Sequence, residues 1–353
     1  MSVIDQPKAV RAGEELDAAK LSAWLEGTLG LTGELAVQQF PSGYSNLTYL
    51  VAKGAIELVL RRPPVGSQVK SGHDMHREFR VLSALSRVYP PAPRPLGFCA
   101  DESVLGAPFY VMERRRGIIL RRTLPDGLAV DAPTLRRMCE ALVDQLAALH
   151  AVDVAAAGLS DLGKPEGYVR RQVEGWSARW AKAKTDEVPD IEALSSWLRE
   201  RVPPETDATL VHNDFKFDNV VLDPDDPSRI VAVLDWEMCT LGDPLLDLGT
   251  TLGYWAEPGD DPAWRAMAFG PTAMPGALTR RELAERYAEQ TGRDVGNMLY
   301  YYAFGLLKIA VIVQQIHWRW KQGYTKDPRF ATLDEVVRVL GRTALAAIAR
   351  GTY

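Results

Sequence analysis

Cysteine is scarce in this sequence, and its few copies form no recognisable site. The three cysteines of the 353-residue chain, Cys99, Cys139 and Cys239, lie far apart and form no C-x-x-C pair. This spacing excludes a cysteine-built zinc site or a redox dithiol as the basis of function. It also fits a reducing compartment, so we expect a cytoplasmic protein.

An excess of charge of one sign is also missing. The chain carries 46 acidic and 41 basic residues, which gives a formal net charge of −5. Such a balance provides no broad basic field for nucleic acid or for an anionic membrane. We therefore expect a small-molecule partner, and no binding to nucleic acid or to a membrane.

Long hydrophobic runs are absent too. The first residues, among them Asp5, Lys8 and Arg11, do not form the apolar region of a secretory signal, so export is not expected. The most apolar later stretch, residues 301–313, contains Lys308 and is shorter than the roughly 20 residues that a membrane-spanning helix needs. We predict that this stretch is a buried core helix.

The common nucleotide-binding signatures are not found. The sequence has no G-x-x-x-x-G-K-[ST] loop, and its strand and helix patterns do not alternate regularly. A P-loop enzyme and a Rossmann-like sheet are therefore disfavoured. A strand-rich first third followed by a helical remainder indicates an α+β chain. Because 353 residues exceed what one hydrophobic core usually organises, we predict two lobes with a cleft between them.

The local patterns show how the two lobes divide the chain. In the first third, helical spacing of apolar residues predicts helices over residues 18–29 and 75–87. Successive antiparallel strands are predicted over residues 36–40, 48–52 and 56–61, and a short apolar strand is predicted over residues 109–112. From residue 134 onward, helical periodicity dominates. The sequence therefore predicts an N-terminal antiparallel β lobe and a larger, mainly helical C-terminal lobe.

The most informative motif lies between two short strand patterns, residues 209–211 and 230–234. There, His212, Asp214 and Asn219 form H-x-D-x-x-x-x-N, the spacing of a kinase catalytic loop. In such a loop the aspartate accepts or orients the proton of the attacking hydroxyl, and the asparagine turns back to hold a metal ion.

A further carboxylate, Asp235, follows directly after the second of these strand patterns. Magnesium prefers oxygen ligands and usually takes one or two carboxylates together with phosphate oxygens and water. Aspartate and asparagine are also common in ordinary turns and at strand ends. Their ordered combination after two apolar strands favours the functional interpretation, in which Asn219 and Asp235 hold Mg²⁺.

With these motifs in view, residues 212–249 resemble the aminoglycoside and choline phosphotransferase superfamily, whose members are relatives of protein kinases. More narrowly, the chain is similar to the kinase-like domains associated with acyl-CoA dehydrogenases. The similar segments are residues 40–49, 58–64, 76–79, 168–180, 212–249 and 304–323. The resemblance implies a protein-kinase-like fold that binds ATP in its cleft, with an N-terminal lobe over 1–113, a hinge at 114–117 and a C-terminal lobe over 118–353.

Carried over residue by residue, the resemblance makes Asp214 the catalytic base and makes Asn219 and Asp235 the Mg²⁺ ligands. It makes His212 a structural support of the loop. Lys216 would contact the γ-phosphate of ATP and offset the charge on the transferred group. The alternative for Lys216 is an ordinary solvated loop lysine.

In the first lobe, Gly43, Ser45 and Asn46 belong to a turn that resembles the loop covering the ATP phosphates. Backbone N–H groups and the side chains of Ser45 and Asn46 would contact phosphate oxygens, although a single glycine between two strands is also typical of an ordinary hairpin. Glu113 corresponds by resemblance to the hinge, whose backbone groups would meet the adenine.

Arg61 marks a departure from the kinase pattern. Residues 58–61 resemble the V-A-I-K strand of kinases, but arginine replaces the lysine that orients ATP. Arginine keeps the positive charge and can bind phosphate bidentately, although it is not interchangeable with lysine. Glu78 would be its ion-pair partner, the alternative being an exposed helix glutamate. The replacement leaves a non-catalytic nucleotide-binding module as the alternative to an enzyme.

Only a short segment separates Asp235 from the next helix pattern, and it contains no A-P-E motif. A protein kinase needs room there for an activation segment and a protein substrate, so the compression favours a small-molecule hydroxyl acceptor. Asp243, which precedes Pro244, is predicted to cap this helix. Asp247 is expected to brace the catalytic loop.

Four residues on two helical segments are candidates for the acceptor pocket: Arg171, Trp176, His317 and Arg319. Arginine and tryptophan suit an anionic or acyl-bearing acceptor better than a polycationic aminoglycoside. The resemblance makes a hydroxyacyl compound the candidate acceptor, and an aminoglycoside kinase is the alternative. The competing interpretation is that the tryptophans pack the core and the arginines face water.

Overall fold

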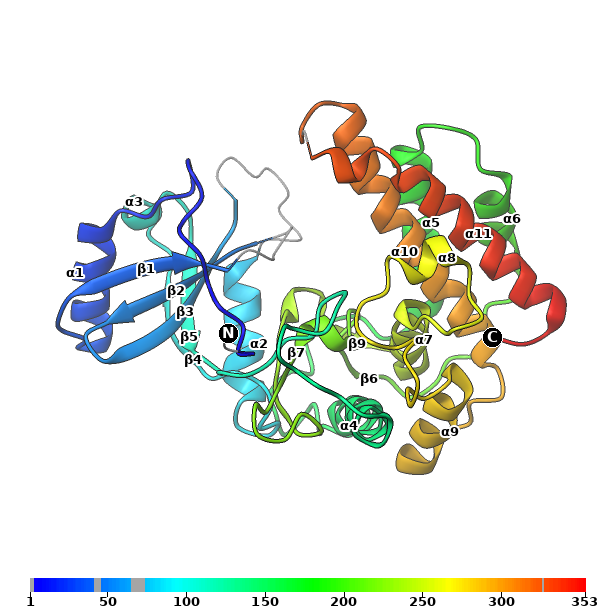
Figure 1. The fold of residues 1–353 in the computed structure, drawn as a ribbon, viewed down its shortest axis with the longest axis horizontal. Coiled ribbons are helices and arrows are strands. Elements are labelled where there is room, and N and C mark those ends of the chain that lie inside the picture. The colour runs from blue at the N-terminus through cyan, green and yellow to red at the C-terminus, as the bar shows by residue number, and fades with distance from the viewer. Residues whose placement is uncertain (1–2, 41–45, 65–73, 326) are drawn as a thin grey trace.

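The structure, a computed structural model, describes residues 3–40, 46–64, 74–325 and 327–353. Figure 1 shows two lobes, one built around a sheet and the other, larger one built mainly of helices. The sheet is formed by the N-terminal part of the chain and the helices by the remainder. The expected α+β, two-lobed architecture is therefore confirmed.

The N-terminal lobe is built on a five-stranded antiparallel sheet with the order β1-β2-β3-β5-β4. Its strands are β1 (Leu35–Gln39), β2 (Leu47–Lys53), β3 (Ile56–Arg62), β4 (Pro95–Cys99) and β5 (Phe109–Glu113). Strand β3 is central, and its Arg61 is paired with Thr48 of β2 and with Tyr110 of β5.

The period-two alternation of the strands divides their side chains between the two faces of the sheet. Leu58 packs on one face in a cluster with α1 (Ala18–Leu29), and the short helix α3 (Glu102–Leu105) contributes to the same cluster. Val59 packs on the opposite face in a cluster with α2 (Met75–Leu85). Arg61 has the same parity as Val59, so its side chain points toward α2.

The C-terminal lobe contains the remaining helices and four short strands. Its helices are α4 (Ala132–His150), α5 (Tyr168–Ala183), α6 (Pro189–Glu200), α7 (Pro244–Tyr254), α8 (Pro262–Arg265), α9 (Arg280–Thr291), α10 (Met298–Lys321) and α11 (Leu333–Arg350). Strand β6 (Thr209–Val211) pairs with β9 (Thr240–Gly242), and β7 (Val220–Leu222) pairs with β8 (Ile230–Val233). Three single turns, η1 (Phe217–Asn219), η2 (Trp236–Met238) and η3 (Pro328–Phe330), complete the described elements.

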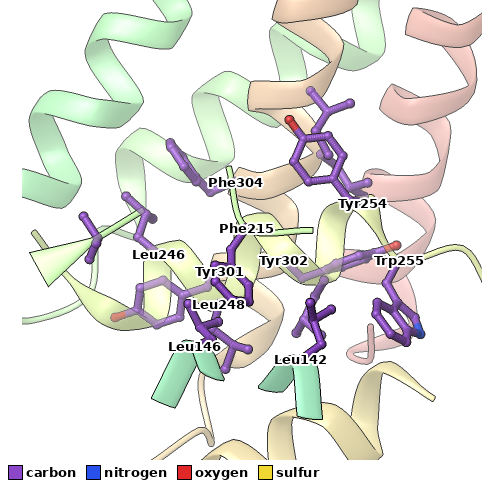
Figure 2. Packing of buried hydrophobic residues seen from close by; sticks show 14 of the residues in the cluster. Leu142, Leu146, Phe215, Leu246, Leu248, Tyr254, Trp255, Tyr301, Tyr302 and Phe304 are labelled. Carbon is purple, nitrogen blue, oxygen red and sulfur yellow. The ribbon is translucent and has the colours of Figure 1, made fainter. Parts of the chain in front are cut away.

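Helices α7 and α10 pack backbone against backbone in the centre of this lobe. A Cβ atom added to Gly249 of α7 would lie 2.3 Å from the backbone oxygen of Tyr301, and one added to Gly305 of α10 would lie 2.3 Å from that of Gly249. Figure 2 shows apolar side chains, among them Phe215 and Leu246, filling the space around this contact. The two helices therefore form a closely fitted support for the loop that contains Phe215.

Helix α10 is, among the described residues, the one helix whose length and composition would suffice to cross a membrane. Inside the protein, 78% of its most apolar window is buried. The expectation of a buried core helix at residues 301–313 is confirmed, because α10 packs between α5, α7 and α11.

The two lobes share part of their apolar core. The cluster beneath α2 continues without interruption into the C-terminal lobe. At the junction, the ring of Tyr89 lies 6.1 Å from that of Trp236, and the backbone N–H of Val233 donates to the carbonyl oxygen of Pro91 (2.8 Å). The backbone N–H of Asp5 also donates to the carbonyl of Gly117. The expected hinge at residues 114–117 is thus flanked by contacts that join the lobes.

Most predicted elements are present within a few residues of their expected ends, but β4 was not predicted. This strand begins with Pro95 and contains Gly97, two residue types that are depleted in strands. Both are tolerated here because β4 is an edge strand. A Cβ on Gly97 would lie 3.0 Å from the ring of Trp24 in α1, so the missing side chain makes room for that ring.

Candidate active site

The loop that follows β6 is held by a single buried carboxylate. Asp247 of α7 is fully buried and accepts hydrogen bonds from the backbone N–H groups of His212 (2.6 Å) and Asn213 (2.7 Å). His150 of α4 contacts the same carboxylate at 3.1 Å. The expectation that Asp247 braces this loop is confirmed, and so is the capping role of Asp243, which accepts from the N–H of Leu245.

Asp214 is held in place by its own loop. The Nδ2 of Asn219 donates to the Oδ2 and to the backbone oxygen of Asp214, each at 2.8 Å, and the ammonium of Lys216 forms an ion pair with the same carboxylate. Burial raises the pKa of Asp214, but the positive charge of Lys216 outweighs it, so that the pKa lies below its usual value. The carboxylate is therefore ionised at neutral pH and can accept a proton.

Lys216 is 9% exposed, so the alternative of a solvated loop lysine is wrong. Its ammonium lies 3.6 Å from Asp218 and over the rings of Tyr254 (4.8 Å) and Phe269 (5.4 Å). Burial lowers the pKa of Lys216, but the Asp214 charge outweighs it and keeps the pKa well above its usual value. A permanent positive charge, the Lys216 ammonium, therefore lies beside Asp214. On the other side of this ammonium, burial raises the pKa of Asp218 to about 6.

His212 is fully buried between Asp214 and the end of β8. Its Nδ1 accepts from the backbone N–H of Asp214 (3.2 Å), and its Nε2 lies 2.8 Å from the carbonyl oxygen of Leu234. Burial lowers the pKa of the imidazole, which favours a neutral ring that accepts at Nδ1 and donates at Nε2. These contacts fit the predicted role of His212 as a support of the loop.

Arg61 lies at the centre of a cluster of carboxylates facing that loop. Its guanidinium forms ion pairs with Glu78 (2.7 Å), Asp235 (3.1 Å) and Glu237 (3.7 Å). Glu78 is 2% exposed, so the alternative of an exposed helix glutamate is wrong. Burial raises the pKa of Glu78, and the Arg61 charge offsets only part of this. Three carboxylates around one guanidinium leave a formal surplus of negative charge.

The donor set around Asp235 fits a magnesium ion. Asn219 and Asp235 offer an amide and a carboxylate oxygen, the hard ligands that Mg²⁺ prefers, and the surplus negative charge around Arg61 would be neutralised by a divalent cation. Among the residues that the structure describes, no three His, Cys, Asp or Glu side chains form a complete metal cage. Such a site would need phosphate and water oxygens, as is usual for Mg²⁺ with a nucleotide.

Glu237 was not predicted from the sequence, although a signal was available. It lies two residues after Asp235, on the turn η2, and its Oε2 accepts a hydrogen bond of 2.7 Å from the Nδ2 of Asn46. A D-x-E arrangement directly after a buried strand could have indicated a second carboxylate at the site. Asn46 is itself buried, so this predicted ATP-binding residue faces the Arg61 cluster.

Of the other predicted ATP-binding residues, Gly43 and Ser45 lie outside the described residues, and Glu113 forms no hydrogen bond or ion pair with the Arg61 cluster in the described part of the chain. The side chain of Glu113, at the end of β5, accepts hydrogen bonds from the backbone N–H of Arg94 (2.8 Å) and from Arg115 (2.9 Å). An adenine contact through the backbone of Glu113 stays a prediction.

Of the four candidate acceptor residues, the structure brings Trp176 close to the loop. Its ring lies 5.8 Å from the ammonium of Lys308, which donates to the backbone oxygen of Asn213. Arg171 instead hydrogen-bonds to the carbonyl oxygens of Glu166 and Lys164, in the loop before its own helix.

Within the described part of the chain, the two candidates near the end of α10 form no hydrogen bond, ion pair or ring contact with the catalytic loop. His317 contacts the carbonyl oxygen of Phe330 at 3.0 Å and stacks on Trp320. Arg319 is exposed. The acceptor-binding roles of Arg171, His317 and Arg319 stay predictions.

Comparison with known sequences provides an independent view of this site. The model of a family described as "Phosphotransferase enzyme family" matches residues 36–292. "Acyl-CoA dehydrogenase family member 10" of Mus musculus is 34% identical over 320 residues, which cover 90% of this chain and 30% of that protein. The chain spans less than half the length of the curated relatives it matches.

Solved structures show the same fold. The crystal structure of a proposed aminoglycoside phosphotransferase from Ralstonia eutropha has a TM-score of 0.78 at 30% identity, covering 94% of this chain and 97% of that one. An aminoglycoside phosphotransferase in ternary complex with ADP and hygromycin B has a TM-score of 0.57 at 18% identity, covering 91% and 98%. The expected kinase-like fold is thereby confirmed.

Proposed function

The chain belongs to the phosphotransferase enzyme family, and on this basis we propose that it moves the γ-phosphate of ATP, in a Mg²⁺-dependent reaction, to a hydroxyl group of a small molecule. The observation that carries the proposal is the ionised, partly buried carboxylate of Asp214, held by Asn219 and Lys216. A relative of the same fold contains ADP, which supports an adenine nucleotide as the donor.

The residues of the site divide the reaction between the two lobes. Asp214 accepts the proton of the attacking hydroxyl, and Lys216 offsets negative charge that builds up on the transferred group. Arg61, held by Glu78, orients the phosphates from the N-terminal lobe. Magnesium, held by Asn219 and Asp235, would neutralise charge on the nucleotide when bound.

A hydroxyacyl compound is the acceptor that we favour. Arg179 is exposed, lies 4.5 Å above the ring of Trp176 and forms no ion pair with a carboxylate among the described residues. An accessible positive charge beside an indole suits an anionic, acyl-bearing acceptor better than a polycationic aminoglycoside. The name of the mouse relative, an acyl-CoA dehydrogenase family member, points in the same direction.

The test is a screen for transfer of labelled γ-phosphate to hydroxyacyl thioesters, to free hydroxy acids and to aminoglycosides. We expect label on at least one hydroxyacyl compound, and none with the Asp214→Asn variant. Labelling of aminoglycosides alone would support the alternative of an aminoglycoside kinase. ATP binding by calorimetry without transfer to any class would support a non-catalytic nucleotide-binding module.

Arg61→Ala is expected to weaken Mg·ATP binding and turnover together, because the phosphates lose their guanidinium and Glu78 is left buried without its partner. Glu78→Ala should reproduce much of the loss by freeing the guanidinium. The double variant should lose less than the sum of the two, with a coupling of about 0.5–3 kcal/mol in a double-mutant cycle. Nucleotide affinity and kcat/KM of the four proteins are the measurements.

Arg61→Lys is the control that separates an enzyme from a non-catalytic module. One guanidinium contacts Glu78 and Asp235 through different nitrogen atoms, and an ammonium lacks this planar fork. A site shaped around arginine should therefore lose activity with lysine. A sharp rise in turnover would instead identify Arg61 as a degraded catalytic position.

A further inference from the structure

Lys308 is a buried charge without an evident structural purpose. It lies in the middle of α10, is 1% exposed and interrupts the longest apolar run of the chain. Burying an ammonium group is costly unless it is paired, and within the described residues no carboxylate forms an ion pair with Lys308. An apolar side chain would serve the packing of α10 better, so stability alone does not account for a lysine here.

The contact that Lys308 makes is to the catalytic loop. Its ammonium donates to the backbone oxygen of Asn213, the residue directly before Asp214. The N–H of the same peptide group belongs to Asp214 and donates to Nδ1 of His212 at 3.2 Å. The peptide that joins Asn213 to Asp214 is therefore held at both of its polar ends.

The backbone at Asn213 needs such support. Its φ of 67° is in the left-handed region, which non-glycine residues rarely adopt. Its side chain is also fully engaged, because Oδ1 accepts from Tyr168 (3.0 Å) and Nδ2 donates to the carbonyl of Met238 (3.1 Å). The direction of the next side chain, Asp214, depends on how this peptide plane is turned.

We propose that Lys308 is a positioning residue of the active site, which fixes the Asn213–Asp214 peptide from α10 and thereby aims the Asp214 carboxylate. The proposal rests on the proposed function, in which Asp214 is the base. A charge-assisted hydrogen bond is stronger than a neutral one, so the positive charge of Lys308 contributes to the hold on the loop. A misplacement of about 1 Å in such a group can cost about 10²-fold in rate.

The charge of Lys308 also gives the contact a pH dependence. Burial lowers the pKa of Lys308 to about 8, while the carboxylates of Asp214 and Asp247 raise it and the cations Lys216 and Arg179 lower it further. Above about pH 8 the folded protein loses this proton, while the unfolded chain keeps it up to about 10.5. In this pH range the unfolded chain binds a proton that the folded protein has lost, so this group adds stability as the pH rises. The hold on the loop weakens over the same range.

The test compares Lys308→Met, which keeps a long unbranched side chain without its charge, with Lys321→Met on the same helix. Lys321 is exposed and pairs with Asp186 at 2.9 Å, so its replacement removes one charge away from the catalytic loop. We expect Lys308→Met to keep or raise Tm, to leave Mg·ATP affinity unchanged and to lower ADP formation, with water as the acceptor, about 10²-fold. Lys321→Met should leave all three unchanged.

The pH profile separates positioning from a purely structural role. Wild-type turnover should fall with a midpoint near pH 8, and Lys308→Arg should retain activity to higher pH because a guanidinium keeps its charge. As the pH rises above about 8, the Tm of the wild type should increase relative to the Tm of Lys308→Met. Unchanged turnover in Lys308→Met, or a lower Tm with unchanged turnover per folded molecule, would overturn the proposal.

A spectroscopic readout keeps the proposal testable without any activity. In protein labelled with carbonyl-¹³C asparagine, the Asn213 resonance should shift in Lys308→Met and not in Lys321→Met. A shift without ADP formation by the wild type would contradict the proposed function but support the contact. An Asn213 resonance that is the same in both variants would contradict the contact itself.

Discussion

Replacing Asp214 by asparagine should lower turnover by about 10²–10⁴-fold, the usual loss when a general base is removed, and should leave Mg·ATP affinity nearly unchanged. The amide keeps the shape of the side chain and can still accept hydrogen bonds from Asn219 and Lys216, so the loop is preserved. Single-turnover kinetics with a verified acceptor, together with nucleotide calorimetry, provide the measurement.

Asp218→Asn is the matched control for this variant. Asp218 lies on the same loop and faces the same lysine at 3.6 Å, so its replacement removes an equal charge without removing the base. We expect a much smaller loss of turnover than for Asp214→Asn. Near-wild-type turnover of Asp214→Asn, or equal losses in the two variants, would rule out Asp214 as the base.

Asp235→Ala should abolish productive Mg·ATP binding, because Asn219 alone is a poor site for a divalent ion. Loss of a supporting group around a metal typically costs 10–100-fold in affinity, so removal of the ligand itself should cost at least about 10²-fold. Arg61 keeps its ion pair with Glu78 in this variant, so the phosphate-orienting charge remains in place.

The measurement for Asp235→Ala is nucleotide affinity as a function of Mg²⁺ concentration. Binding of ADP in the presence of a chelator serves as the control, and it should be similar in wild type and variant. If the variant showed the wild-type dependence on Mg²⁺, Asp235 would not be the ligand. If the variant lost only the metal-independent binding of ADP, measured with the chelator present, the role of Asp235 would be limited to its contact with Arg61.

The sequence allowed those parts of the site to be predicted that lie close together along the chain. His212, Asp214 and Asn219 share one loop, and the structure places Asp214 in contact with each of the other two. Their spacing alone carries this information, because a short loop between two strands has few ways to arrange them. For the same reason Asp243 could be recognised as a helix cap from its neighbour Pro244.

Residues that reach the site by tertiary packing were not predictable in the same way. Lys308 looked like an interruption of an apolar run, and its partner Asn213 lies far away in the sequence. On α5, helical periodicity could not show which face would turn toward the loop. Trp176 lies on the inner face, whereas Arg171 lies on the outer one and binds its own preceding loop.

The apolar cluster beneath α2 continues into the helical lobe. This continuity determines where the chain can be divided without loss of its core. A break at residues 114–117 would expose the packed rings of Tyr89 and Trp236 to water, together with much of the cluster to which both belong. Neither fragment could then bury its own share of that surface, although apolar burial is the dominant favourable term in folding. The unit that gene fusion can transfer to a longer polypeptide is therefore the pair of lobes together.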